Sequence, residues 1–147
     1  MKNILISACL LGVACRYDGK SVPLPAAIRL KDKYNLIPVC PEILGGLPTP
    51  RLPCEIQNGR VIRSDSEDMT SAYKRGAAEA LKLAKLFDCE IAVLKERSPS
   101  CGCGKIYDGS FSSLLTNGDG ITSALLKQNG VTVFGESEIY SISKGEA

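Results

Sequence analysis

Four short apolar runs, separated by segments with helical periodicity, set the hydrophobic pattern of this chain. Runs of four to seven apolar residues bounded by Gly, Pro or Asn are typical of buried strands. They predict strands at Lys2–Ala8, Leu36–Val39, Ile91–Leu94 and Val131–Phe134.

Three helices are predicted between these runs. The first spans Pro25–Lys33, where Pro25 suits the first helical turn because that position needs no backbone N–H. The second begins at Ser64, with Glu67 completing a capping box, and runs to about Phe87. The third spans Gly120–Gln128 and ends at the Asn-Gly pair that follows.

Alternating strands and helices predict a single-domain, three-layer α/β/α fold with a mostly parallel sheet. Right-handed crossovers favour the strand order 2-1-3-4. A small β-hairpin is expected over Ile56–Ile62, because Asn58-Gly59 lies between apolar residues. The domain is expected to cover residues 1–136, followed by a frayed C-terminal tail at 137–147.

Two long connections lack a regular pattern. Residues 40–53 are rich in Pro and Gly, and we expect them to form an irregular wall of a site. Residues 95–119 form a second loop, which carries two cysteines and two aromatic residues. A loop of this length in a small domain is usually functional or disordered, and its composition favours function.

The composition is that of an ordinary globular domain, with 147 residues, 44% hydrophobic and 23% charged, and a net charge of +2. That charge is too small to indicate a nucleic-acid partner. Because no apolar stretch approaches a membrane span, we expect a cytoplasmic protein without a membrane partner. The chain has no histidine, so catalysis by imidazole is excluded.

Seven cysteines in such a chain point to thiol chemistry. Cys9 and Cys40 directly follow or end predicted strands, and Cys101 lies in the loop after the third strand. Loops at the carboxyl ends of parallel strands open on one edge of the sheet, where ligands bind. We therefore expect these three thiols to converge in one pocket.

The spacing leaves several thiol chemistries open. A 4Fe–4S cluster held by three cysteines leaves one iron without a protein ligand. A structural zinc needs a fourth ligand, which Cys15 or Cys103 could supply. Cys101 and Cys103 could instead form a redox-active pair. Cys54 and Cys89 are interpreted as packing residues, while Cys15 and Cys103 remain undecided.

Polar residues close to these cysteines are candidates for catalysis and binding. Glu42 could deprotonate water and Ser98 could orient water or substrate, although both also suit ordinary loops. Arg51 could hold an anionic or carbonyl group of a ligand, or simply pair with an acid. Tyr17 and Tyr107, each in a Tyr-Asp-Gly turn, could stack on an aromatic base or simply form tight turns.

Taken together, these motifs resemble the DUF523 family over nearly the whole chain, from Lys2 to about Phe134. The residues that carry the resemblance are Ser7-Ala8-Cys9-Leu10-Leu11-Gly12, Arg16-Tyr17-Asp18-Gly19, Pro38-Val39-Cys40-Pro41-Glu42, Gly45-Gly46-Leu47, Pro50-Arg51, Ser98-Pro99-Ser100-Cys101-Gly102 and Ile106-Tyr107-Asp108-Gly109.

The resemblance implies a thiouracil desulfidase with a 4Fe–4S cluster, which air can destroy. It assigns the cluster ligands to Cys9, Cys40 and Cys101, and the catalytic pair to Glu42 and Ser98. The open iron would take the sulfur of a thiolated pyrimidine while water attacks the ring carbon, without redox change. The extra cysteines at positions 15, 54 and 103 depart from the family's pattern.

Two other classes of function stay open beside the desulfidase. One is a non-catalytic protein that binds iron–sulfur, zinc or sulfur, and the other is a thiol redox enzyme that uses Cys101 and Cys103. The expected partner is a small thiolated pyrimidine, while the choice among base, nucleoside and thiolated RNA, and the oligomeric state, stay undetermined.

Overall fold

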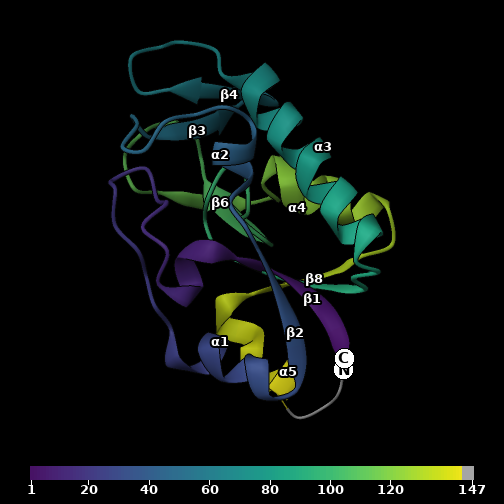
Figure 1. Cartoon of the computed structure of the whole chain (residues 1–147). Helices are drawn as coiled ribbons and strands as arrows, with labels where there is room; N and C mark the ends of the chain where they lie inside the picture. Colours follow the sequence, from purple (N-terminus) through teal and green to yellow (C-terminus); the bar gives the residue numbers. More distant parts are fainter. Residues whose placement is uncertain (144–147) are drawn as a thin grey trace.

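The computed structural model describes residues 1–143, and a four-stranded parallel sheet lies at its centre (Figure 1). Its strands are β1 (Lys2–Ser7), β2 (Tyr34–Val39), β5 (Ile91–Leu94) and β8 (Thr132–Gly135). Their order is β2-β1-β5-β8, and every neighbouring pair is parallel. In chain order this is 2-1-3-4, so the predicted fold class and strand order are confirmed.

Helices cover both faces of the sheet (Figure 1). On one face Ile4 and Ile6 of β1 pack toward α1 (Pro25–Arg29) and α5 (Ile139–Ser143). On the other face Leu5 packs toward α3 (Thr70–Leu86) and α4 (Ile121–Gln128). Because successive strand residues point to opposite faces, this alternation produces the three layers.

The predicted frayed tail is wrong for residues 137–143. A 3-10 turn at Glu136–Glu138 leads into α5, and Ile139 and Ile142 are 2% and 0% exposed in the core. Apolar residues three positions apart share one face of a helix, so this short segment can bury both. The rest of the predicted tail, 144–147, lies outside the described residues.

The long helix begins at Thr70 rather than at Ser64, so the predicted capping box is wrong. Residues 64–69 fold back on the preceding hairpin, where the Met69 N–H donates to the Val61 carbonyl at 2.7 Å. The Asp68 carboxylate accepts the N–H of Thr70, the first residue of α3, at 2.9 Å. The predicted first helix is α1 followed by one 3-10 turn at Leu30–Asp32.

The two long connections contain more regular structure than predicted. The predicted hairpin is confirmed as β3 (Cys54–Gln57) and β4 (Arg60–Arg63). However, residues 40–53 include a short helix, α2 (Pro41–Leu44), and residues 95–119 include a second hairpin, β6 (Lys105–Tyr107) and β7 (Leu115–Asn117). Strands β6 and β7 have only three residues each, too few for an alternating pattern to show in the sequence.

The length and polarity of the helices bear on membrane association. Among residues 1–143, no helix combines the length and the apolar character that crossing a bilayer requires.

Candidate functional site

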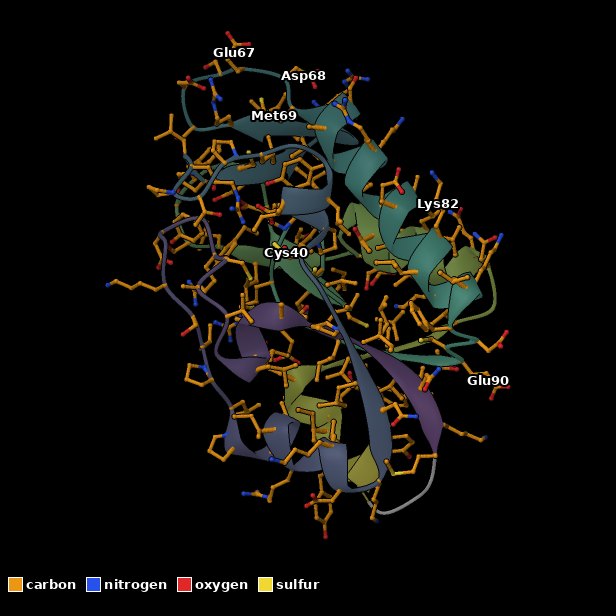
Figure 2. The ribbon with its side chains drawn as sticks, viewed as in Figure 1. Cys40, Glu67, Asp68, Met69, Lys82 and Glu90 are labelled. Carbon is orange, nitrogen blue, oxygen red and sulfur yellow. The ribbon has the colours of Figure 1, made fainter. Side chains whose placement is uncertain are left out.

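The carboxyl ends of β1, β2 and β5 surround a cavity of about 370 Å³. Ser7 of β1 pairs with Val39 of β2, so Cys9 and Cys40 emerge from the sheet side by side. The loop after β5 brings Cys101 to the same place. Cys40 lies near the middle of the molecule, between the sheet and the β3–β4 hairpin (Figure 2).

Every residue predicted for the site lines this cavity. The set is Cys9, Tyr17, Cys40, Glu42, Arg51, Ser98, Cys101 and Tyr107. The three thiols predicted to converge therefore line one cavity in the structure, and each is a free thiol outside any disulfide.

A tight turn fixes the position of Cys101. The Ser98 hydroxyl oxygen accepts the backbone N–H groups of Ser100 and Cys101, each at 3.0 Å. Ser7 at the end of β1 accepts the Lys95 N–H at 2.9 Å and hydrogen-bonds to the Cys101 thiol. Ser98 thus has the turn role of a Ser-Pro sequence, and its own hydroxyl proton remains available to the cavity.

Burial favours the protonated thiol at Cys9 and Cys101. Burial raises the pKa of Cys9 to about 11, although the nearby Lys95 ammonium partly offsets the effect. Burial also raises the pKa of Cys101, against the hydrogen bond from Ser7. Binding a cationic metal centre as thiolates must therefore displace protons.

A fourth thiol, Cys15, lies beside Cys40. The Cys40 thiol donates to the Cys15 carbonyl at 3.6 Å, and the Cys15 side chain lines the cavity. The pKa of Cys15 is raised to about 12, mainly by burial and to a lesser extent by the nearby Cys40 and Cys9 groups.

The other three cysteines differ in their surroundings. Cys103 faces away from the cavity, because its thiol donates to the Val133 carbonyl at 3.6 Å. This placement favours Cys101 over Cys103 as a ligand. Cys89 is buried in the core, as its packing interpretation requires. Cys54 is also packed in a core cluster, yet it lines the cavity as well.

Glu42 is held from two sides. The Arg51 Nε donates to Glu42 Oε1 at 2.8 Å, and the two side chains are only 7% and 14% exposed. Arg51 also donates to the carbonyls of Cys15 and Pro48 and to the Thr49 hydroxyl. The Arg51 guanidinium therefore donates its hydrogen bonds to protein groups, which favours a role in positioning Glu42. The predicted contact between Arg51 and the substrate stays a prediction.

Tyr73 of α3 provides the second support, and sequence reasoning missed it. Its side chain is 2% exposed and lies within hydrogen-bonding reach of Cys54 and Glu42. Burial, and then the charge of Glu42, raises the pKa of this phenol, which stays protonated and able to donate. The sequence signal for this role was the Tyr73 hydroxyl, which lies on the largely apolar face of the long helix and needs a hydrogen-bond partner there.

Glu55 of β3 is a second residue that sequence reasoning missed. It is a buried carboxylate that lines the cavity and accepts the backbone N–H groups of Gly109 and Phe111. Glu55 directly precedes the predicted hairpin Ile56–Ile62, and a charged residue there is a weak signal, because hairpin strands usually expose one face.

A single metal ion needs its ligand atoms gathered around one point. Within residues 1–143, no three Cys, Asp or Glu side chains lie close enough together to hold one ion. A tetrahedral zinc with Zn–S bonds of about 2.3 Å brings its sulfurs within about 4 Å of one another. A 4Fe–4S cluster takes thiolate ligands on separate iron atoms, and Cys9, Cys40 and Cys101 supply that donor type at one cavity.

An α/β/α fold with three free thiols at neighbouring strand ends defines a thiol-lined ligand site. The sequence pattern of the 2-thiouracil desulfurase family matches residues 4–138, and the chain belongs to this family. The uncharacterized protein YbbK of Bacillus subtilis (strain 168) is 42% identical over 149 residues, covering 95% of this chain and 99% of YbbK.

A solved structure extends the similarity to the fold. The [4Fe-4S]-dependent thiouracil desulfidase TudS (DUF523Vcz) superposes with a TM-score of 0.93 at 40% identity. The match covers 99% of this chain and 97% of TudS, so the resemblance to DUF523 seen in the motifs extends over the whole fold.

Proposed function

We propose that this protein is a [4Fe-4S]-dependent thiouracil desulfidase. It replaces the thiocarbonyl sulfur of a thiolated uracil by oxygen from water, giving uracil and hydrogen sulfide without net oxidation or reduction. The observation that carries the proposal is the convergence of three free thiols, a carboxylate and a hydroxyl in one cavity of about 370 Å³. Membership in the 2-thiouracil desulfurase family and the likeness to TudS support it.

Cys9, Cys40 and Cys101 would hold the cluster as its three protein ligands. The donor set fits, because thiolates are the ligands that such clusters take and the chain has no imidazole. When bound, the cluster would supply a Lewis-acidic iron able to take a thiocarbonyl sulfur and polarise the attached carbon. Ser7 and Ser98 hold the third ligand in place through its side chain and backbone.

Glu42 accepts a proton from the attacking water, and Ser98 orients that water. Both groups line the cavity beside the thiols. Carboxylates assist proton transfer when they are positioned within hydrogen-bond reach of the reacting group. Arg51 and Tyr73 fix the Glu42 carboxylate, so it needs little rearrangement before it acts.

Aromatic residues at the cavity support a planar substrate. Tyr17 and Tyr107 line it from two different loops, and rings of this kind stack on nucleobases. The Arg16 guanidinium lies 5.7 Å from the centroid of the Tyr17 ring and steadies it through a cation–π contact. A small thiolated pyrimidine is therefore the proposed substrate, with no nucleic-acid partner.

The alternatives receive less support. A structural zinc takes four ligands around one point, and among residues 1–143 no three Cys, Asp or Glu side chains are gathered in that way. A redox pair of Cys101 and Cys103 would need facing thiols, but Cys101 hydrogen-bonds to Ser7 and Cys103 to Val133. A non-catalytic binding protein would not need the held carboxylate of Glu42. Seven cysteines, an odd number, suit a reducing compartment better than a closed disulfide framework, so we propose a cytoplasmic location.

The test is sulfide release by protein reconstituted with iron and sulfide without oxygen. We expect one hydrogen sulfide and one uracil for each thiouracil consumed, and little turnover by Glu42→Gln. Glu96→Gln is the matched control, because Glu96 also lines the cavity but bonds to Ser137. Wild-type protein that carries an intact cluster but leaves 2- and 4-thiouracil unchanged would refute the proposal.

A further inference from the structure

The loop between β6 and β7 adopts a costly backbone conformation. Gly109, Phe111 and Ser113 have φ angles of 93°, 55° and 60°. Side chains other than glycine rarely adopt such angles, and they persist only where surrounding contacts enforce them. Residues of this kind concentrate at ligand-binding sites, which makes the loop a candidate for function.

The β3–β4 hairpin enforces this conformation. One oxygen of the Glu55 carboxylate accepts the N–H groups of Gly109 at 3.0 Å and Phe111 at 3.1 Å. The Gln57 side chain donates to the Gly109 carbonyl at 2.6 Å. A Cβ at Gly109 would lie 2.6 Å from the Ile56 carbonyl oxygen, so only glycine permits this approach.

The result of this arrangement is the position of Phe111. It lines the cavity together with Tyr17 and Tyr107. Phe111 is 38% exposed, which is unusual for a large apolar residue held so firmly. A buried carboxylate and a strained backbone are both unfavourable, and here both hold one partly exposed aromatic residue at the mouth of a site.

We propose that Phe111 stacks on the pyrimidine ring of the substrate and that Glu55 is the positioning residue that presents it. This inference rests on the proposed function and adds a substrate-binding residue to it. Stacking acts equally on substrate and product, because both present the same planar ring. Phe111 therefore contributes to binding and to KM rather than to the chemical step.

The test compares Phe111→Ala with Leu114→Ala in protein carrying the cluster. Leu114 belongs to the same loop and is 58% exposed, but it does not line the cavity. Calorimetric titration with uracil measures binding without turnover, and iron and sulfide analysis checks the cluster. We expect Phe111→Ala to weaken uracil binding and raise KM for 4-thiouracil, each by about tenfold, with kcat and cluster content retained.

Two further variants separate stacking from folding. Phe111→Tyr should bind uracil as the wild type does, because its ring can still stack. Glu55→Gln keeps a carbonyl oxygen that can accept both N–H groups and should stay close to the wild type, whereas Glu55→Leu should behave as Phe111→Ala does.

The outcomes distinguish this inference from the proposed function. Active wild-type protein whose Phe111→Ala variant binds uracil as tightly as Leu114→Ala would overturn the inference alone. Wild-type protein with an intact cluster that releases no sulfide would overturn the proposed function and this inference with it.

Discussion

Gly76 of α3 lies so close to Pro41 of α2 that a Cβ at Gly76 would overlap the Pro41 carbonyl oxygen. Gly45 at the end of α2 has the same relationship to the Ala72 carbonyl oxygen. Two glycines thus let the short helix that carries Glu42 lie directly against the long helix that carries Tyr73. This contact makes the hydrogen bond between those two side chains possible.

Gly76→Ala should separate the two helices. In an exposed helix this change stabilises by about 1 kcal/mol, but overpacking here should destabilise by about 1–3 kcal/mol. Activity should fall at least tenfold because Glu42 moves with α2. Thermal unfolding and sulfide release measure the two effects. Ala78→Gly, at an exposed site on α3, should cost about 1 kcal/mol and keep its activity.

Tyr73→Phe should lower kcat about tenfold, with the cluster content unchanged. The substitution keeps the ring but removes the hydroxyl that reaches Glu42 and Cys54. A lost hydrogen bond of this kind also costs about 1 kcal/mol of unfolding free energy. Tyr34→Phe, in the core near α1, is the control and should leave kcat unaffected. Equal kcat values for both variants would contradict the positioning role of Tyr73.

Arg51→Lys should impair the enzyme although it preserves the charge. Lysine is a point charge and cannot reach Glu42, the Cys15 carbonyl and the Pro48 carbonyl together. We expect a loss of about 1–3 kcal/mol in stability and of about tenfold in kcat. Arg60→Lys, in an exposed pair with Asp68, should change neither. A raised KM with normal kcat would instead indicate direct substrate contact by Arg51.

Ile142→Ala should destabilise the fold by about 2–4 kcal/mol, because it opens a cavity under α5. A chain that ended at residue 136 would lose the same contacts. Denaturant unfolding measures the effect, with Leu86→Ala, which is 72% exposed, as the control. Equal midpoints for the two variants would contradict a core role for Ile142.

The parallel sheet and its ligand-binding edge were predictable because apolar runs and crossover rules constrain them strongly. Once the order was 2-1-3-4, the positions of Cys9, Cys40 and Cys101 followed from the strand ends. Local signals were less reliable. Ser64 carries a good capping sequence, but backbone pairing of residues 67–69 with β4 outweighs it.

The supporting residues of the site were not predictable, since their roles depend on contacts between distant segments. Glu55 and Phe111 are 56 residues apart, and their hydrogen bond depends on how two hairpins meet. Tyr73 fits the apolar face of a helix, and only the close approach of α2 gives its hydroxyl a partner. Glu42, Ser98 and Arg51 were candidates from the sequence, but the second support of Glu42, Tyr73, was not.

Cluster assembly in single Cys→Ser variants tests the central claim most directly. Iron and acid-labile sulfide per chain should approach four each in the wild type after reconstitution without oxygen, since this is the composition of a 4Fe–4S cluster. We expect Cys9→Ser, Cys40→Ser and Cys101→Ser to lose most of both, and Cys103→Ser, whose thiol faces Val133, to retain them. Full assembly in any of the first three variants, or loss confined to Cys103→Ser, would contradict the account.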